Sequence, residues 1–123
     1  MEVFIADDSA IIRERLADLL SSVPEIELIG HAEEVTKAIH SIQKLNPDVV
    51  IFDFQMADGK GLGVLKSVKR NKPTPIFIVF TNHSYPQYRE KCMSAGADYF
   101  FDKSTEFEEM MEVLRKMICN SCT

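Results

Sequence analysis

Five short apolar runs alternate with five helical stretches along the chain, and this alternation constrains the fold more than any other feature. The apolar runs are rich in Val, Ile and Phe and span residues 3–6, 26–29, 49–52, 76–80 and 98–101. Short runs without a polar alternation predict strands buried on both faces of a parallel sheet. Apolar periodicity and boundary signals predict helices over residues 12–23, 35–45, 62–68, 86–95 and 107–118. Strictly alternating strands and helices predict an α/β domain with helices on both faces of the sheet.

Composition fits one globular domain and narrows its partners. The chain has 123 residues, of which 46% are hydrophobic and 27% charged. Its net charge of −5 argues against direct contact with nucleic acid. No apolar run approaches the roughly 20 residues of a membrane span, and the first residues lead directly into a strand without the features of a signal peptide. With three cysteines, an odd number, a reducing cytoplasm is the expected location.

Polar residues of particular types stand where four of the predicted strands end. These residues are Asp7, Asp8, Asp53, Thr81 and Lys103. Because parallel strands end at one edge of a sheet, we expect these side chains to converge. Three carboxylates at about 4 Å from one another would each repel by roughly 4 kcal/mol per pair at an effective dielectric near 20. A divalent cation with oxygen ligands, such as Mg²⁺, and the lysine ammonium would relieve this repulsion.

The same set of residues suits phosphoryl transfer, with Asp53 as the nucleophile. Three carboxylates, one Mg²⁺ and Lys103 sum to a net charge of zero. An aspartyl phosphate would replace the single charge of Asp53 with a charge near −2, by analogy with other phosphorylated side chains. The cation and Lys103 would hold the added charge, and Thr81 would donate a hydrogen bond to a phosphoryl oxygen. Positioning and charge stabilisation of this kind are what phosphoryl transfer chiefly requires.

In these residues the sequence resembles the receiver domain of two-component response regulators. The resemblance covers residues 2 to 118, and further matches are Met56, Gly61 and Gly96-Ala97-Asp98. It implies a flavodoxin-like, doubly wound sheet of five parallel strands in the order 2-1-3-4-5, with five helices. It further implies that Asp53 accepts a phosphoryl group from a sensor histidine kinase or a histidine phosphotransfer protein. Mg²⁺ would be held by Asp8, Asp53 and the main-chain carbonyl of Gln55, with Asp7 acting largely through water.

The resemblance also implies a switch built on Thr81 and Phe100. On phosphorylation Thr81 would move toward the phosphoryl group, and Phe100 would turn inward into the vacated space. This would remodel the face of the fourth helix, fifth strand and fifth helix, which a downstream protein, an output domain or a second phosphorylated copy would read. Several positions depart from the family pattern, among them Asn82, where the family commonly has a small residue, and Ala57, where it often has Pro. Ser104 follows Lys103 where the family usually has Pro, so we expect a strained or differently built loop, and Phe100 lacks the hydroxyl of the common Tyr.

Several alternatives stay open. Residues 1–118 are expected to form the receiver domain and 119–123 a C-terminal tail, either as a stand-alone switch or as the input part of a DNA-binding transcriptional regulator. In both cases the chain would be a phosphoacceptor and not a turnover enzyme. A phosphohydrolase of the haloacid-dehalogenase type also uses a strand-end Asp and Mg²⁺, but it needs a second Asp where this chain has Gln55. A degenerate receiver that binds partners without phosphorylation is disfavoured by the complete acidic set.

Overall fold

The alternation of strands and helices is confirmed by a computed structural model, which describes residues 1–56, 62–68 and 75–121. The strands are β1 (Glu2–Ala6), β2 (Glu27–Ala32), β3 (Val49–Phe52), β4 (Ile76–Thr81) and β5 (Tyr99–Asp102). The helices are α1 (Ala10–Ser21), α2 (Val35–Leu45), α3 (Leu62–Val68), α4 (Pro86–Ser94) and α5 (Phe107–Ser121). Gly61, which the sequence matched to the family, lies outside the described residues.

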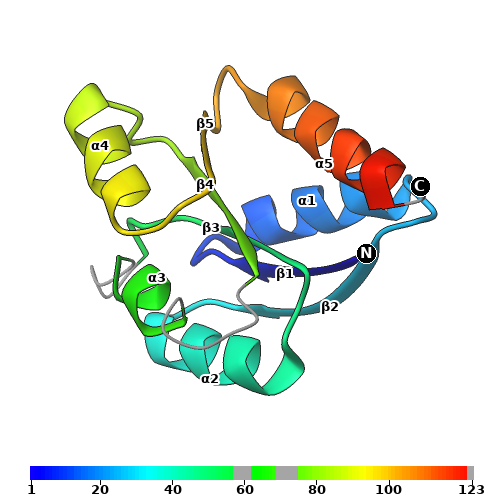
Figure 1. The fold of residues 1–123 in the computed structure, drawn as a ribbon, viewed down its shortest axis with the longest axis horizontal. Coiled ribbons are helices and arrows are strands. Elements are labelled where there is room, and N and C mark those ends of the chain that lie inside the picture. The colour runs from blue at the N-terminus through cyan, green and yellow to red at the C-terminus, as the bar shows by residue number, and fades with distance from the viewer. Residues whose placement is uncertain (57–61, 69–74, 122–123) are drawn as a thin grey trace.

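The strands form one parallel sheet in the order β2-β1-β3-β4-β5, as expected (Figure 1). This order places β1 and β3 side by side in the middle and moves outward to β4 and β5 on one side. Ala6 is level with Phe52, and Phe52 is level with Val79. The ends of the three central strands therefore lie at one edge of the sheet, which is the edge where the polar residues were predicted to converge.

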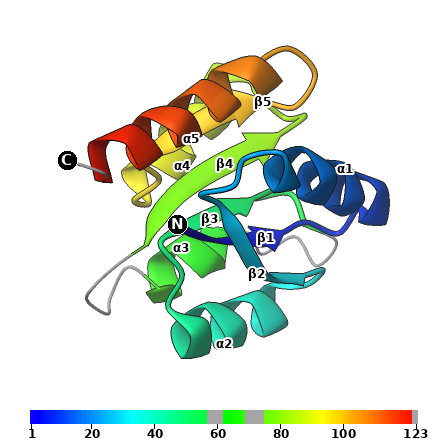
Figure 2. The same cartoon turned by 90° about the vertical axis from the view of Figure 1, so that its right-hand side faces the viewer.

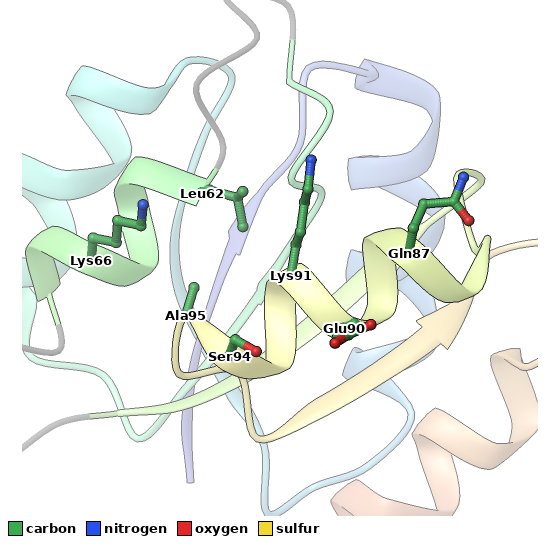
Figure 3. A pocket seen from close by; sticks show the side chains of 7 residues that line it. All are labelled: Leu62, Lys66, Gln87, Glu90, Lys91, Ser94 and Ala95. Atoms are coloured by element: carbon green, nitrogen blue, oxygen red, sulfur yellow. The ribbon is translucent and has the colours of Figure 1, made fainter.

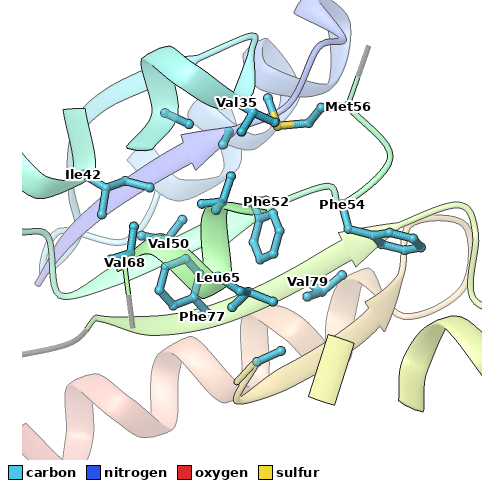
Figure 4. Close-up of a cluster of buried hydrophobic side chains, with 14 of the residues drawn as sticks. Val35, Ile42, Val50, Phe52, Phe54, Met56, Leu65, Val68, Phe77 and Val79 are labelled. Carbon is cyan, nitrogen blue, oxygen red and sulfur yellow. The ribbon is translucent and has the colours of Figure 1, made fainter. Parts of the chain in front are cut away.

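Two hydrophobic layers cover the two faces of the sheet. Successive strand residues point to opposite faces, and they join α2, α3 and α4 on one side and α1 and α5 on the other (Figures 1 and 2). In the first layer Phe52 and Phe77 meet edge to face, with ring centroids 5.7 Å apart (Figure 4). Such pairs add roughly 0.5–1.5 kcal/mol beyond the burial of their area. The double covering explains why β3 contains no polar residue.

The edge strand β2 is longer than the sequence predicted. The predicted run ended at residue 29, whereas the strand continues through Gly30 to Ala32. The pairing with β1 shifts between Val3 and Phe4, so that Phe4 is opposite Gly30. A Cβ at position 30 would lie 3.1 Å from the Phe4 ring, which explains a glycine inside this strand.

Local signals set several of the helix boundaries. The Ser9 side chain accepts a hydrogen bond from the Ile12 N–H and caps α1. Asn46 ends α2 with a left-handed φ of 50°, and Gly96, with a φ of 114°, follows α4. Helix α5 continues to Ser121, past residue 118 where we placed the end of the domain. No helix among the described residues is long and apolar enough to cross a membrane.

Candidate functional site

Main-chain hydrogen bonds extend the sheet by one residue beyond its strands and so fix the backbone of the site residues. The Asp53 N–H donates to the Ala6 carbonyl at 3.0 Å, and the Asp7 N–H donates to the Ala32 carbonyl at 3.0 Å. The Lys103 N–H donates to the Thr81 carbonyl at 2.9 Å. Each residue is therefore held at the carboxyl edge of the sheet before its side chain makes any contact.

The Lys103 ammonium joins two carboxylates from different strands. Its Nζ lies 2.6 Å from Asp7 Oδ2 and 2.8 Å from Asp53 Oδ2. All three side chains are largely buried, with exposed fractions of 6% for Lys103, 3% for Asp7 and 9% for Asp53. Charge-assisted hydrogen bonds of this length are among the strong ones in proteins. Three residues that lie up to 96 positions apart in the sequence thus form one buried charged cluster with a net charge of −1.

The second oxygen of each carboxylate is held by a main-chain donor. Asp7 Oδ1 accepts a hydrogen bond from the Ser9 N–H, and Asp53 Oδ1 accepts one from the Gln55 N–H, both at 2.9 Å. Arg13 adds a contact from α1, because its Nη1 donates to the Asp7 carbonyl at 2.7 Å. Among the described residues, no buried side-chain nitrogen or oxygen is left without a partner. The orientation of both carboxylates is therefore determined by the backbone around them.

The electrostatics of the cluster follow from burial and from the shared lysine. Burial raises the pKa of the Asp7 carboxyl above its usual range, which outweighs the opposing effect of the hydrogen bonds from Lys103 and Ser9. For Lys103 burial acts in the direction of a lower pKa. The hydrogen bonds and charges of Asp53 and Asp7 together exceed this effect, and the pKa of Lys103 is raised. The lysine thus stays protonated between its two carboxylates at neutral pH.

Thr81 ends β4 beside this cluster, but its hydroxyl is directed to its own loop. The residue is fully buried, and Oγ1 accepts a hydrogen bond from the His83 N–H at 3.1 Å. This is a local side-chain-to-backbone turn of the type that Thr favours at strand ends. Because a hydroxyl can accept and donate at the same time, this contact leaves the Thr81 hydroxyl hydrogen for another partner.

Phe100 is turned inward in this structure. It is 3% exposed, and its ring lies 6.4 Å from that of Phe54 between centroids. The guanidinium of Arg89 covers the ring at 5.7 Å. This is the orientation that the resemblance attaches to the phosphorylated switch, and the switch itself stays a prediction. A Phe ring has no hydroxyl that must reach water, so the apolar contact with Phe54 favours the buried position.

Two other predicted site residues lie at the edge of the cluster. Asp8 is exposed, and so is Gln55 in the turn after Asp53. Among the described residues, Asp8 forms no hydrogen bond or ion pair with the other predicted site residues. Within that same part of the chain, no three His, Cys, Asp or Glu side chains gather into a ready metal centre. The donor set nevertheless suits Mg²⁺, which uses one or two carboxylates and completes its shell with water and phosphate oxygens.

Sequence reasoning missed Asp102, which binds the loop that carries Lys103. Asp102 Oδ1 accepts hydrogen bonds from the Ser104 N–H at 2.7 Å and the Thr105 N–H at 3.2 Å, and Oδ2 accepts one from the Ser84 hydroxyl. The hydrogen bond from Ser84, followed by that from the Ser104 N–H, lowers the pKa of Asp102. A local signal was present, since an Asp at the end of a strand commonly bonds to the backbone N–H two residues ahead in a turn.

Comparison with known proteins identifies the family of this chain. The family model for the response regulator receiver domain matches residues 3–115. The chain belongs to the response regulator receiver domain family. In this family context the charged cluster lies at the carboxyl edge of a flavodoxin-like sheet, in agreement with the strand order.

Curated relatives of this receiver domain are longer proteins. It is 33% identical to protein-glutamate methylesterase/protein-glutamine glutaminase 2 of Saccharophagus degradans, covering 97% of the chain and 36% of that protein. It is 30% identical to the uncharacterized transcriptional regulatory protein YvfU of Bacillus subtilis, covering 96% of the chain and 59% of that protein. The receiver thus spans between about a third and three fifths of these two relatives.

Solved structures show the same fold. The response regulator domain of Thermotoga maritima CheB superposes with a TM-score of 0.79 at 26% identity, covering 98% of this chain and 94% of the other. A LuxR-family DNA-binding response regulator from Staphylococcus aureus gives a TM-score of 0.84 at 27% identity, covering 94% and 96%. The chain is therefore similar along nearly all its length to receiver domains of regulators with different outputs.

Two hollows differ in their relation to the site. A hollow of about 730 Å³ between α3 and α4 is lined by Leu62, Lys66, Gln87, Glu90, Lys91, Ser94 and Ala95 (Figure 3). It contains none of the predicted site residues. A smaller hollow of about 170 Å³ between α1 and α5 is lined by Ile12, Arg15, Leu16, Leu19, Phe80, Lys103 and Phe107. Only the smaller one reaches the charged cluster, through Lys103.

Proposed function

We propose that this receiver domain accepts a phosphoryl group on Asp53 and acts as a phosphorylation-controlled switch. The observation that carries the proposal is the Lys103 ammonium, which lies 2.8 Å from Asp53 Oδ2 and 2.6 Å from Asp7 Oδ2. A fixed cation beside one carboxylate oxygen stabilises the negative charge that is added when that carboxylate is phosphorylated. The Gln55 N–H orients Asp53 through its other oxygen.

The proposed transfer starts from a phosphohistidine of a sensor kinase or a histidine phosphotransfer protein. A carboxylate oxygen of Asp53 forms a bond to phosphorus while the bond from phosphorus to the imidazole nitrogen breaks, and that nitrogen keeps the electron pair. Lys103 moves its hydrogen bond to the charged product, and the Thr81 hydroxyl donates to a phosphoryl oxygen. Positioning and charge stabilisation of this kind supply most of the catalysis in phosphoryl transfer. Water later cleaves the acyl phosphate, so that the chain returns to its initial state.

We propose that the site holds Mg²⁺ when it acts. Asp7, Asp8, Asp53 and the Gln55 main-chain carbonyl would be its ligands or would reach it through water. Bound Mg²⁺ neutralises charge on the transferring phosphoryl group. Asp53 and Asp7 offer buried oxygen ligands of the type Mg²⁺ prefers, and Asp8 follows Asp7 directly with an exposed side chain.

The switch would act through Thr81 and the loop after β4. Thr81 Oγ1 now accepts from the His83 N–H. We propose that its hydroxyl donates to the phosphoryl group on Asp53 and that the loop after β4 shifts with it. In the proposed switch the phosphoryl group would shift the population toward the inward position that Phe100 has in this structure. A downstream protein, an output domain or a second copy would read the altered face of α4, β5 and α5.

The proposal is tested with the protein, Mg²⁺ and acetyl phosphate, followed by intact-mass measurement. We expect a gain of one phosphoryl group in the natural chain, no gain in Asp53→Asn, and an unchanged gain in Asp18→Asn, which alters an exposed carboxylate on α1. Absence of the gain in the natural chain would overturn the proposal. Continuous release of phosphate from a phosphate ester would favour a hydrolase of the haloacid-dehalogenase type instead, although Gln55 offers that chemistry no acid.

A further inference from the structure

The turn that carries Lys103 is built on the side chain of the preceding residue. Asp102 Oδ1 accepts from the Ser104 N–H at 2.7 Å and from the Thr105 N–H at 3.2 Å, so the turn encloses Lys103. The Asp102 N–H in turn donates to Glu106 Oε1 at 3.0 Å. A residue of this type commonly replaces main-chain interactions in a turn by bonding to the backbone two residues ahead.

The other oxygen of Asp102 reaches across to the loop after β4. It accepts a short hydrogen bond from the hydroxyl of Ser84, which lies three positions after Thr81. The Ser104 hydroxyl and the Asn82 side-chain oxygen form a second, longer contact between these loops at 3.3 Å. Together with the hydrogen bond from the Lys103 N–H to the Thr81 carbonyl, these contacts hold the two loops together.

Hydrogen bonds that fix the backbone on both sides of Lys103 affect the position of its ammonium group strongly. Its side chain has a flexible stem that loses rotamer entropy when it is fixed, and it must reach two carboxylates from one Cα position. A small change in the backbone at position 103 would move Nζ away from one of them. The Ser104 N–H is central here, because a proline at that position would have no hydrogen to donate to Asp102.

We propose that Asp102 is a positioning residue for Lys103. Its carboxylate accepts hydrogen bonds from the β4–α4 and β5–α5 loops and so holds the Lys103 ammonium between Asp7 and Asp53. Asp102 touches neither the phosphoryl donor nor Asp53 and acts only through Lys103. The kinetic part of this inference rests on the proposed phosphorylation of Asp53, whereas the structural part does not.

The structural part is tested by NMR of the lysine ammonium groups in the full chain without phosphodonor. A buried, hydrogen-bonded Nζ gives a slowly exchanging ammonium signal, which is assigned to position 103 by its loss in Lys103→Arg. We expect the signal to persist in Asp102→Asn, whose amide oxygen still accepts from the Ser104 N–H, and to broaden or vanish in Asp102→Ala. The exposed Asp18→Ala serves as the control. A signal unchanged in Asp102→Ala would overturn the inference.

The kinetic part is tested by a double-mutant cycle on the rate of phosphorylation by acetyl phosphate. We expect Asp102→Ala to lower the rate constant about tenfold, or about 1.4 kcal/mol, and Asp102→Asn to restore most of it. In a Lys103→Ala background, Asp102→Ala should have no further effect, because its path of action is gone. An undiminished tenfold loss in that background would show general damage to the fold and would overturn the positioning role.

The two tests separate the inference from the function on which it rests. If the natural chain takes up no phosphoryl group at all, the proposed function fails, and the ammonium signal alone decides the role of Asp102. If the natural chain is phosphorylated and Asp102→Ala reacts at the same rate, the proposed function stands and the positioning role fails.

Discussion

Two aspartates at the same edge of the sheet experience opposite environments. Asp7 is 2% exposed, and its burial raises its pKa despite the nearby ammonium of Lys103. Asp102 is half-buried and forms an outer polar cluster with Ser84 and Ser104. In this outer cluster the Ser84 hydroxyl and the backbone N–H groups of the turn lower the pKa of Asp102. The charge of Asp7 therefore costs stability, while the charge of Asp102 contributes stability. In the proposed function the interior cluster of Asp7, Asp53 and Lys103 receives the charge of a phosphoryl group, whereas the outer cluster joins two loops by hydrogen bonds.

The largest test of this contrast removes the shared cation from the interior cluster. Lys103→Met leaves Asp7 and Asp53 buried without their partner, and breaking a buried ion pair in this way typically costs about 3 kcal/mol or more. We expect the free energy of unfolding in urea at pH 7, without divalent cations, to fall by about that amount. Lys91→Met, on the exposed side of α4, should change it by less than about 0.5 kcal/mol. Equal losses of unfolding free energy in the two variants would show that Lys103 does not stabilise the buried carboxylates of Asp7 and Asp53.

The same division between interior and surface applies to the cysteines. Cys92 is fully buried, and burial, followed by the negative charge of Asp53, raises its pKa to about 11, whereas Cys119 is exposed. At pH 8 we expect iodoacetamide to modify Cys92 at least about a hundredfold more slowly than Cys119, because the thiolate is the reactive form. Peptide mass mapping over time gives both rates, and unfolding in urea should remove the difference. Comparable rates in the folded chain would contradict the burial of this helix face.

Removing the carboxylate of the outer cluster should cause a smaller loss of unfolding free energy, and that loss should depend on pH. Asp102→Ala should lower the free energy of unfolding by about 1 kcal/mol at pH 7, the net contribution of a typical hydrogen bond. A lowered pKa in the folded state gives stability that is present above the ordinary value of 3.8. That stability is lost as the pH falls through the lowered folded value. Thermal unfolding of the natural chain and the variant between pH 2 and pH 7 should therefore converge below pH 3.8, and a constant difference would argue against the charge of Asp102.

The smallest effect should have the opposite sign and a different pH window. A raised folded pKa means that the charged Asp7 costs stability above that pKa and that the cost is absent below 3.8. Asp7→Asn should therefore be slightly more stable than the natural chain at pH 7, and the gain should vanish as the pH falls toward 3.8. The gain is expected to be small because the variant also loses one charged partner of Lys103. A loss of stability at pH 7 would mean that the ion pair outweighs burial.

The convergence of the site residues could be predicted from the sequence, because it follows from the order of strands and helices along the chain. Apolar runs ending in Asp7, Asp53 and Lys103 must end at the same edge if they are parallel strands of one sheet, and the long lysine side chain spans the intervening strand β4. The position of Phe100 could not be predicted in the same way, since it depends on the Phe54 ring and on Arg89 from another element. Side-chain packing of this kind leaves no periodic signal in a single sequence.

The role of Asp102 was missed for a related reason. The sequence showed that Ser104 stands where the family usually has Pro, and we expected a strained or differently built loop. The structure has a turn built on Asp102, which uses the N–H that a proline would lack. Its second contact, with Ser84, joins residues 18 positions apart in two loops, and no local pattern predicts such a pair.

The most direct test of the account asks where a phosphoryl group is bound. The protein is incubated with acetyl phosphate and Mg²⁺ and then reduced with borohydride, which converts an aspartyl phosphate to homoserine. Peptide mass spectrometry then locates the homoserine. We expect conversion at position 53 and at no other aspartate. Conversion at Asp7 or Asp8, or no conversion in a folded chain, would contradict the claim that Asp53, in the buried cluster around Lys103, accepts the phosphoryl group.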